Sequence, residues 1–509
     1  MNAIASGFPI LTVLTVLPLV GAAIALFAGR HARGIALVTS FACLVLSLLI
    51  WVSLPANGII GLVELHSWAP SLGVEYHLGV DGLGALMLLL SAIVTLMSVD
   101  ASHRVHHMPG LFYGLILILE SGLFGSFTAL NFFHWFLFWE LSLIPAFFLI
   151  KLWGGPRRGP AATQFFVYTM AGSVALLLSF LAVFLSTGSM DFGDLAAMAA
   201  SGALTQMVTA HLGSVMPWLA IGVLAGFAVK VPIVPFHTWL PAAYAEAPSP
   251  VTMLLTGAMS KMGVYGLLRI ALPIFGVQIA AMRTPLLILA VVTVVMGAWA
   301  AAAQKDLKRV FAYSSVNHLG YCLLAIFALA IPATGAAQQA SQAAALNGVI
   351  LQMFNHGITA AAIFWFIAMI QFRTGGLRGI NDFGGLRKPA PVFAGIMGIV
   401  LFSSLGLPGL NSFVSEFLIF RGVFPLSWIS ATVSVLGLLV TAIVVLTVIQ
   451  KVFAGPVPER WVNFPDLHHS ERIALAPVIG LMFLVGLAPR LILDTINPTV
   501  MNLLSHWRF

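Results

Sequence analysis

The sequence predicts an all-α polytopic membrane protein with about 14 transmembrane helices, including two inverted five-helix repeats that each contain a broken helix. Three observations support this prediction. The 509 residues are 60% hydrophobic and 8% charged, whereas soluble domains carry about 25% charged residues. Apolar runs of roughly 20 residues, the length that crosses a bilayer as a helix, recur along the whole chain. Two of these runs are interrupted by glycine and proline.

The apolar runs place the spans in chain order. We expect them at about 8–29, 35–54, 80–99, 110–129, 131–150, 162–186, 214–244, 249–271, 284–304, 308–331, 345–371, 390–422, 427–453 and 472–489. They group into N-terminal helices (1–109), a first repeat (110–271), a second repeat (284–453) and a C-terminal helix with its tail (454–509). Because each repeat has an odd number of spans, the second copy would be inverted across the membrane.

The two interrupted spans carry the predicted site. The span at 214–244 contains Lys230 and then Pro232, Pro235 and Pro241, and each proline removes a backbone donor and kinks or ends a helix. The span at 390–422 is interrupted by the GLPGLN sequence at 406–411. Two corresponding Gly/Pro interruptions point to a site between inverted repeats. Two unrelated kinked helices are the alternative interpretation.

The positions of lysine and arginine predict the topology. If the first connecting loop is cytoplasmic, 16 of these residues fall on the cytoplasmic side and 5 on the other. Lys230 and Lys261, inside spans, complete the 23. Cytoplasmic loops are enriched in Lys and Arg, so both termini are predicted outside. The net charge of +7 follows from this loop pattern and does not indicate nucleic-acid binding.

Ionisable residues inside membrane spans are costly and are functional candidates by default. Burial disfavours the charged form of each group, and an opposite charge nearby restores it. A buried acid–base set can therefore exchange protons, so the sequence predicts a proton or ion path. The candidates are Glu120, Glu140, Lys230, His237, Lys261, His318, His356 and Glu416.

Each candidate has an expected role. We expect Glu140 and Lys230 to pair, with Glu120 as a second carboxylate nearby. Lys261, deep in its span, is the central relay group, His318 carries the relay onward, and Glu416 is the terminal carboxylate. His237 and His356 are secondary candidates. A static ion pair, hydrogen-bonded core histidines and a lysine that reaches an interface are the structural alternatives.

Sites for redox cofactors and metals are not recognisable in the sequence. It contains no P-loop, no strand–GxGxxG–helix pattern and no cysteine cluster. Cys43 and Cys322 lie in apolar runs and are expected to be packed core residues. The HRVHH sequence at 103–107 is expected to be a solvated loop. The chain alone is therefore not expected to perform redox chemistry.

Four separated blocks carry a family resemblance: FWELSLIPAFFLIKLWGGPRR, VKVPIVPFHTWLPAAYAEAPSPVTMLLTGAMSKMGVYGLLR, QKDLKRVFAYSSVNHLGY and GLPGLNSFVSEF. They resemble the antiporter-like membrane subunits of respiratory complex I, in particular the M-type branch, over about residues 80–455. The resemblance implies 14 helices with two inverted repeats. It places the glutamate–lysine pair on Glu140 and Lys230, the central lysine on Lys261, the relay histidine on His318 and the terminal glutamate on Glu416.

The resemblance also implies a function and partners. It implies proton pumping in a bacterial inner membrane, driven by quinone reduction in other subunits of an NADH-quinone oxidoreductase. NADH, FMN, iron–sulfur clusters and quinone would be bound by those partner subunits. The membrane neighbours would be L-type and N-type subunits.

One departure from the family sequence leaves alternatives open. The family usually has Asp after the Leu-Pro of the broken helix, often with His two residues on. Here Ala242, Ala243 and Tyr244 follow Pro241. Related chains occur in multisubunit Na⁺/H⁺ antiporters, hydrogenases and complexes that couple proton flow to CO₂ hydration. A cation/proton antiporter subunit and a non-conducting scaffold are therefore the rival functions.

Overall fold

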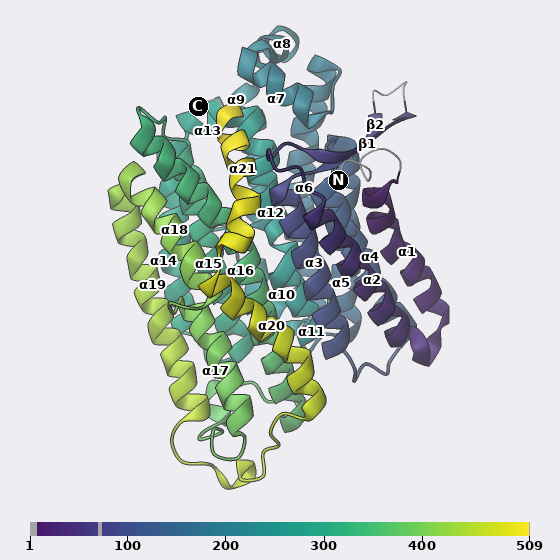
Figure 1. Ribbon diagram of the computed structural model, residues 1–509, viewed down its shortest axis with the longest axis vertical. Coiled ribbons are helices and arrows are strands. Elements are labelled where there is room, and N and C mark those ends of the chain that lie inside the picture. Colours follow the sequence, from purple (N-terminus) through teal and green to yellow (C-terminus); the bar gives the residue numbers. More distant parts are fainter. Residues whose placement is uncertain (1–7, 70–73, 508–509) are drawn as a thin grey trace.

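Long helices running along one common direction form the protein (Figure 1). The computed structural model describes residues 8–69 and 74–507. Within this part of the chain, twelve helices are long and apolar enough to cross a membrane. The predicted class, an all-α polytopic membrane protein, is therefore confirmed.

The spanning helices occupy the predicted stretches. Before the first break they are α1 (Ile10–Phe27), α2 (Ala32–Val52), α3 (Gly82–Ala101), α4 (Pro109–Thr128), α5 (Phe132–Trp153) and α6 (Arg158–Thr187). After it come α11 (Ser249–Leu254), α12 (Lys261–Gly266) and α13 (Leu272–Ala281), which form one helix with π-helical turns at Leu255–Met259 and Leu267–Ala271. The later spans are α14 (Arg283–Ala302), α15 (Leu307–Leu329), α16 (Ala336–Thr374), α19 (Trp428–Val448) and α20 (His469–Leu487).

Both broken spans lie where the glycines and prolines predict them. The first consists of α9 (Met216–Lys230) and α10 (Trp239–Glu246), and the second of α17 (Pro391–Leu405) and α18 (Asn411–Leu426). Each half is shorter than a full span, which is why these segments are not among the twelve. In each predicted repeat the break falls in the fourth helix. The inverted relation between the repeats, and their boundaries, stay predictions.

Backbone groups freed by the first break find partners inside the protein, as a membrane interior requires. The Val234 amide donates to the Thr293 hydroxyl of α14 over 3.1 Å. The Trp239 indole donates to the carbonyl of Val229 over 3.0 Å.

Three segments expected as loops or tail are structured. The stretch at 55–79 forms most of a β-hairpin, with β1 (Gly61–Ala69) antiparallel to β2 (Val74–Val80). The polar stretch after α6 forms α7 (Phe192–Ser201) and α8 (Ala203–Leu212), and α21 (Arg490–His506) follows the last span. These segments are short or amphipathic, so they do not give the long apolar signal by which the spans were found. Arg508, one of the five basic residues that the topology prediction places on the outer side, lies beyond the described residues.

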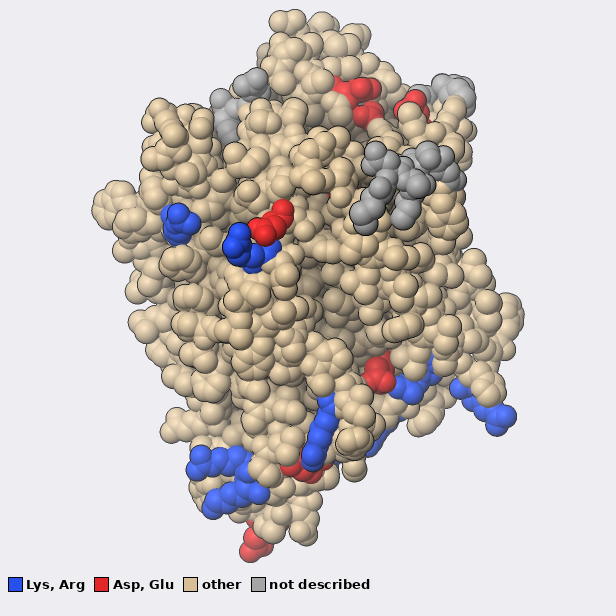
Figure 2. Space-filling view, in the orientation of Figure 1, with Lys and Arg blue, Asp and Glu red and all other residues tan. Residues whose placement is uncertain are grey.

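The two ends of the bundle differ in charge. On the face shown in Figure 2, most lysines and arginines gather at the lower end. Ion pairs there join separate segments of the chain, including Arg33 of α2 to Asp100 of α3 (2.7 Å) and Arg378 to Asp306 (2.6 Å). We call this the basic end. The opposite end carries the β-hairpin, α7 and α8 (Figure 1), and we call it the hairpin end.

A histidine–aspartate contact fastens the hairpin to α7. Asp191 caps α7 by accepting the amides of Gly193 and Asp194 through Oδ1. Its Oδ2 lies 2.6 Å from Nδ1 of His77 on β2. The hydrogen bond to Asp191 raises the pKa of the His77 imidazole. The contact therefore stabilises the docked hairpin most when His77 is protonated.

The second break depends on a glycine. Gly406 has φ +79°, a left-handed conformation that costs roughly 1–2 kcal/mol for residues with a Cβ. A Cβ at this position would lie 2.8 Å from Oε2 of Glu416. The backbone of the break therefore occupies the space directly beside a buried carboxylate.

We predict that protection of the hairpin depends on pH through His77. Because the pKa of His77 is higher in the folded protein, its contact with Asp191 stabilises the hairpin fully below the unfolded pKa of about 6.5. This stabilisation is lost as the pH rises through the folded pKa of His77. Hydrogen–deuterium exchange of residues 61–80, corrected for intrinsic rates, should show loss of protection with rising pH. His77→Gln should remove that dependence, and His211→Gln on exposed α8 should not. A pH dependence that survives in His77→Gln would contradict this assignment.

We predict that Gly406→Ala lowers the thermal unfolding midpoint of the purified protein. The change adds left-handed strain and a Cβ against Glu416. Gly395→Ala is the matched control, because Gly395 lies in α17 and a Cβ there meets nothing within 4 Å. The control should be neutral or slightly stabilising. Equal midpoints for the two variants would show that the break does not need this glycine.

Candidate functional site

Lys261 is the centre of the buried polar groups. Its side chain is fully buried, and its Nζ contacts Nδ1 of His356 (2.8 Å), Oγ of Ser260 (3.3 Å) and the carbonyl of Thr256. The π-helical turn explains the last contact. The Ser260 amide bonds to the Leu255 carbonyl and not to that of Thr256, as it would in a regular α-helix. The Thr256 carbonyl can therefore accept from the side chains of Ser260 and Lys261. Two of the three partners of Lys261, the Thr256 carbonyl and the Ser260 hydroxyl, therefore come from its own helix.

A series of ionisable groups continues from Lys261 to the second break. The rings of His356 on α16 and His318 on α15 have centroids 5.3 Å apart. Nδ1 of His318 lies 3.1 Å from Oε1 of Glu416 on α18. The structure thus brings together Lys261, His318 and Glu416, and it inserts His356, a secondary candidate, between the first two. We call Lys261, His356, His318 and Glu416 the relay row.

A small cavity adjoins the middle of the relay row. It has about 10 Å³ of free volume, roughly the minimum for one water molecule. His318 and His356 line it together with hydroxyl side chains of Thr359, Ser404 and Ser412. Such a cavity can hold a water that bridges the two imidazoles.

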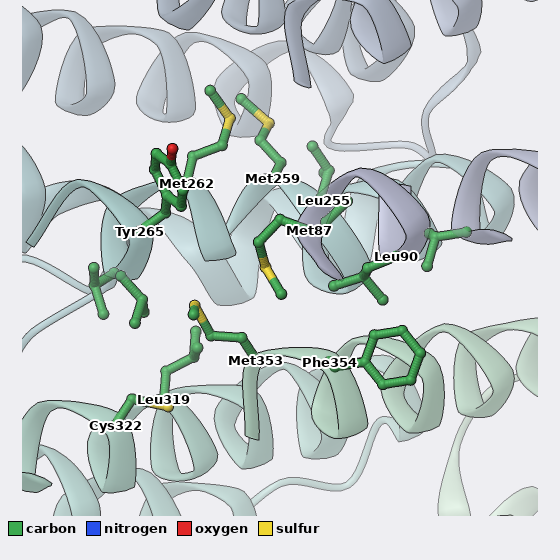
Figure 3. Close-up of a cluster of buried hydrophobic side chains, with 14 of the residues drawn as sticks. Met87, Leu90, Leu255, Met259, Met262, Tyr265, Leu319, Cys322, Met353 and Phe354 are labelled. Atoms are coloured by element: carbon green, nitrogen blue, oxygen red, sulfur yellow. The ribbon is translucent and has the colours of Figure 1, made fainter. Parts of the chain in front are cut away.

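Apolar side chains enclose the beginning of the row. Met87 of α3, Met259 and Met262 on either side of Lys261 in the sequence, and Met353 of α16 belong to one cluster of buried hydrophobic side chains (Figure 3). All four are buried. Packing of this kind excludes bulk water and strengthens each electrostatic contact of the lysine.

Lys230 is buried at the end of α9 but does not form the expected direct ion pair with Glu140. Its ammonium lies over the Trp139 ring, 4.5 Å from the centroid, a cation–π contact. Glu140 follows Trp139 and acts on Lys230 electrostatically from a greater distance. Oε1 of Glu140 is buried without a hydrogen-bond partner, and Glu140 lines an apolar groove of about 460 Å³ between α5 and α6.

The remaining candidates lie apart from the relay row. Glu120 is fully buried and accepts from Ser40 of α2 over 3.3 Å, so its hydrogen bond is not with Lys230 or Glu140. His237 lies in the first break, with its ring 6.2 Å from that of Tyr313 and its Nδ1 buried without a partner.

Sequence reasoning missed several buried charged residues, among them Lys308 and an Arg269–Asp81 pair. Lys308, which we counted among the cytoplasmic basic residues at the start of a span, is 1% exposed and donates to the Ala247 carbonyl after α10. Lys308 lies in the first turn of α15, just after the capping residue Asp306, where lysines are usually solvated. The sequence therefore gives no sign that it is buried. At the hairpin end, Arg269 and Asp81 form a buried ion pair of 2.6 Å. The two residues are far apart in sequence, and only the fold brings them together.

A group that could ligate a metal lies at the hairpin end, although we expected none. Atoms of Glu75, His77 and Asp191 lie within 4.8 Å of one another. His77 and Asp191 already bond to each other and Glu75 is exposed. The contact that holds the hairpin therefore accounts for this arrangement.

Comparisons with known proteins agree with this geometry. Residues 129–443 match the family described as NADH:quinone oxidoreductase/Mrp antiporter, TM. The NADH-quinone oxidoreductase subunit M of Rhodobacter capsulatus is 33% identical over 98% of this chain and 97% of its own length. The NADH-quinone oxidoreductase subunit M of Mycobacterium tuberculosis is 32% identical over 98% of this chain and 94% of its own length.

Solved structures show the same architecture. A chain of respiratory complex I from Thermus thermophilus with bound NADH superimposes with a TM-score of 0.85, at 26% identity, over 98% of this chain and all of its own. A chain of the Mrp complex from Dietzia sp. has a TM-score of 0.83 at 19% identity, over 99% of this chain and 98% of its own, which shows a shared fold. With a family match over more than half of its residues and full-length relatives above 30% identity, this chain belongs to the NADH:quinone oxidoreductase/Mrp antiporter family of membrane subunits.

Proposed function

We propose that this chain is a proton-translocating membrane subunit of a respiratory NADH-quinone oxidoreductase. The relay row is the observation that carries the proposal. Four buried ionisable side chains from four helices follow one another at hydrogen-bond or ring-contact distance. Buried ionisable groups arranged in series inside a membrane protein are typical of proton relays.

The proposed path has a direction. The basic end faces the cytoplasm by the positive-inside rule, and the hairpin end with both termini faces outward. Protons enter from the cytoplasm near the α9–α10 break and load the Lys261 amine. They pass to His356, cross to His318 through the small cavity, and reach Glu416 on the way out. Each imidazole can accept at one nitrogen and donate from the other.

Coupling is proposed to come from neighbouring subunits. NADH, FMN, iron–sulfur clusters and quinone are bound elsewhere in the complex, where quinone reduction supplies the energy. Glu140 is placed to receive the signal, because it lines a lateral apolar groove that an L-type or N-type neighbour can cover. A change in the charge of Glu140 changes the electrostatic field at Lys230.

We predict that Lys261→Arg permits assembly but stops pumping. Arginine keeps the positive charge but does not release its proton in proteins. Proton uptake by proteoliposomes that contain the purified complex should fall by about tenfold or more, given the 10²- to 10⁴-fold that a positioned transfer group commonly contributes. Lys261→Ala should also stop pumping. Lys451→Ala, at an exposed lysine, should leave pumping unchanged.

Several outcomes would change the assignment. Normal pumping by both Lys261 variants would rule out the relay and support a scaffold. A strict requirement for Na⁺ in proton flux would favour a cation/proton antiporter. The chains that co-purify with the protein can be identified by mass spectrometry. A hydrogenase or a CO₂-hydrating partner among them, in place of NADH- and quinone-handling subunits, would assign the chain to a different complex.

A further inference from the structure

A second small cavity lies on the other side of Lys261, toward Lys230. It has about 10 Å³ of free volume, and its lining includes Lys230, Tyr244 and Ser260. Trp239, Leu255 and Met259 form its apolar walls. The cavity thus adjoins Lys230 and also Ser260, the residue whose hydroxyl contacts the ammonium of Lys261. The relay row does not include this region.

Buried hydroxyl groups surround the Lys261 side of the cavity. Tyr244 is 1% exposed, and its hydroxyl donates to the Leu255 carbonyl over 3.0 Å. Ser260 lines the same cavity as Tyr244. Ser260 Oγ in turn lies 3.3 Å from Nζ of Lys261. Ser260 therefore connects the cavity to the central lysine, and Tyr244 adds a second buried hydroxyl residue to the cavity lining.

The local backbone makes this arrangement possible. In the π-helical turn Leu255–Met259, the Leu255 carbonyl accepts from both the Ser260 amide and the Tyr244 hydroxyl. Ser260 Oγ donates to the Thr256 carbonyl over 3.0 Å. π-Helical turns often mark functional sites because they alter the regular carbonyl pattern. Here the turn fixes the phenol and the serine at one side of the lysine.

We propose that the Tyr244 and Ser260 hydroxyls, with one water in this cavity, form the proton-conducting link between Lys230 and Lys261. The inference rests on the proposed proton translocation and deepens it. The apolar walls hold water weakly, so water enters mainly on the polar groups at the two ends of the cavity. Entry of water thus controls whether the two lysines exchange protons.

The transfer balances without any further reactant. The Lys230 ammonium gives a proton to the cavity water, and that water passes a different proton to the hydroxyl pair. The hydroxyl pair then gives one of its own protons to the neutral Lys261 amine and keeps the proton that it received from the water. Lys230 ends neutral and Lys261 ends as the ammonium, while each hydroxyl and the water are restored. Hydroxyls suit this role because each can donate and accept.

Tyr244→Phe tests the link, because it removes one oxygen and keeps the packed ring. Proton uptake per NADH oxidised, measured with the whole complex in proteoliposomes, should fall by roughly tenfold. This is less than the 10²- to 10⁴-fold that a positioned transfer group commonly contributes, because Ser260 and the water remain. The ratio of pumping rates in H₂O and D₂O should increase, since the slowed proton transfer becomes rate-limiting. Tyr244→His should restore pumping in part, because imidazole again donates and accepts.

Tyr113→Phe is the matched control. Tyr113 is also buried, and its hydroxyl also donates to one backbone carbonyl, that of Ser102, over 2.8 Å. Its loss should change neither pumping nor the isotope ratio. If Tyr244→Phe does not assemble, Ser260→Ala decides the question by the same two measurements.

The result separates this inference from the proposed function. If Lys261→Arg stops pumping but Tyr244→Phe and Ser260→Ala pump at the normal rate and isotope ratio, the link is wrong and the relay stands. If the Lys261 variants themselves pump normally, the proposed function is wrong. Loss of pumping in both hydroxyl variants, with a normal Tyr113→Phe control, supports the link.

Discussion

A lysine buried in a membrane protein without a carboxylate partner is the constraint on which the rest of the site depends. Transfer of an unpaired charge from water into an apolar interior is strongly unfavourable. Lys261 meets this cost with a backbone carbonyl, a hydroxyl and an imidazole instead of an ion pair. None of these partners fixes the lysine in one protonation state. A close carboxylate would hold it charged, whereas this environment leaves both forms accessible.

The irregular backbone follows from the same constraint. A regular helix uses its own carbonyls, so it has none to offer a buried ammonium. The π-helical turn before Lys261 frees the carbonyl of Thr256, and the break at Gly406 leaves space for the carboxylate of Glu416. Both irregularities lie beside members of the relay row. Irregular backbone at membrane depth is tolerated where protein or a water-filled cavity surrounds it.

The sequence predicted the features that depend on local chemistry. Pro232 and Pro235 marked the first break, Gly406 and Gly409 marked the second, and the apolar runs marked the spans. Features that depend on helix packing were not predictable. Nothing near His356 indicates that it bonds to Lys261, 95 residues away. Likewise, adjacency of Glu140 to Trp139 does not reveal that the indole, and not the carboxylate, contacts Lys230.

The two buried lysines differ in a way that suits coupled transfer. Lys230 rests on an aromatic face, which attracts the cation but offers no acceptor lone pair for a hydrogen bond. Its charge is therefore sensitive to the more distant Glu140, which lies at a lateral groove. Lys261 has direct hydrogen-bond partners and is flanked in the sequence by the buried Met259 and Met262. A signal that arrives at Glu140 thus acts first on the more weakly held lysine, and only a hydrogen-bonded connection can carry its effect to Lys261.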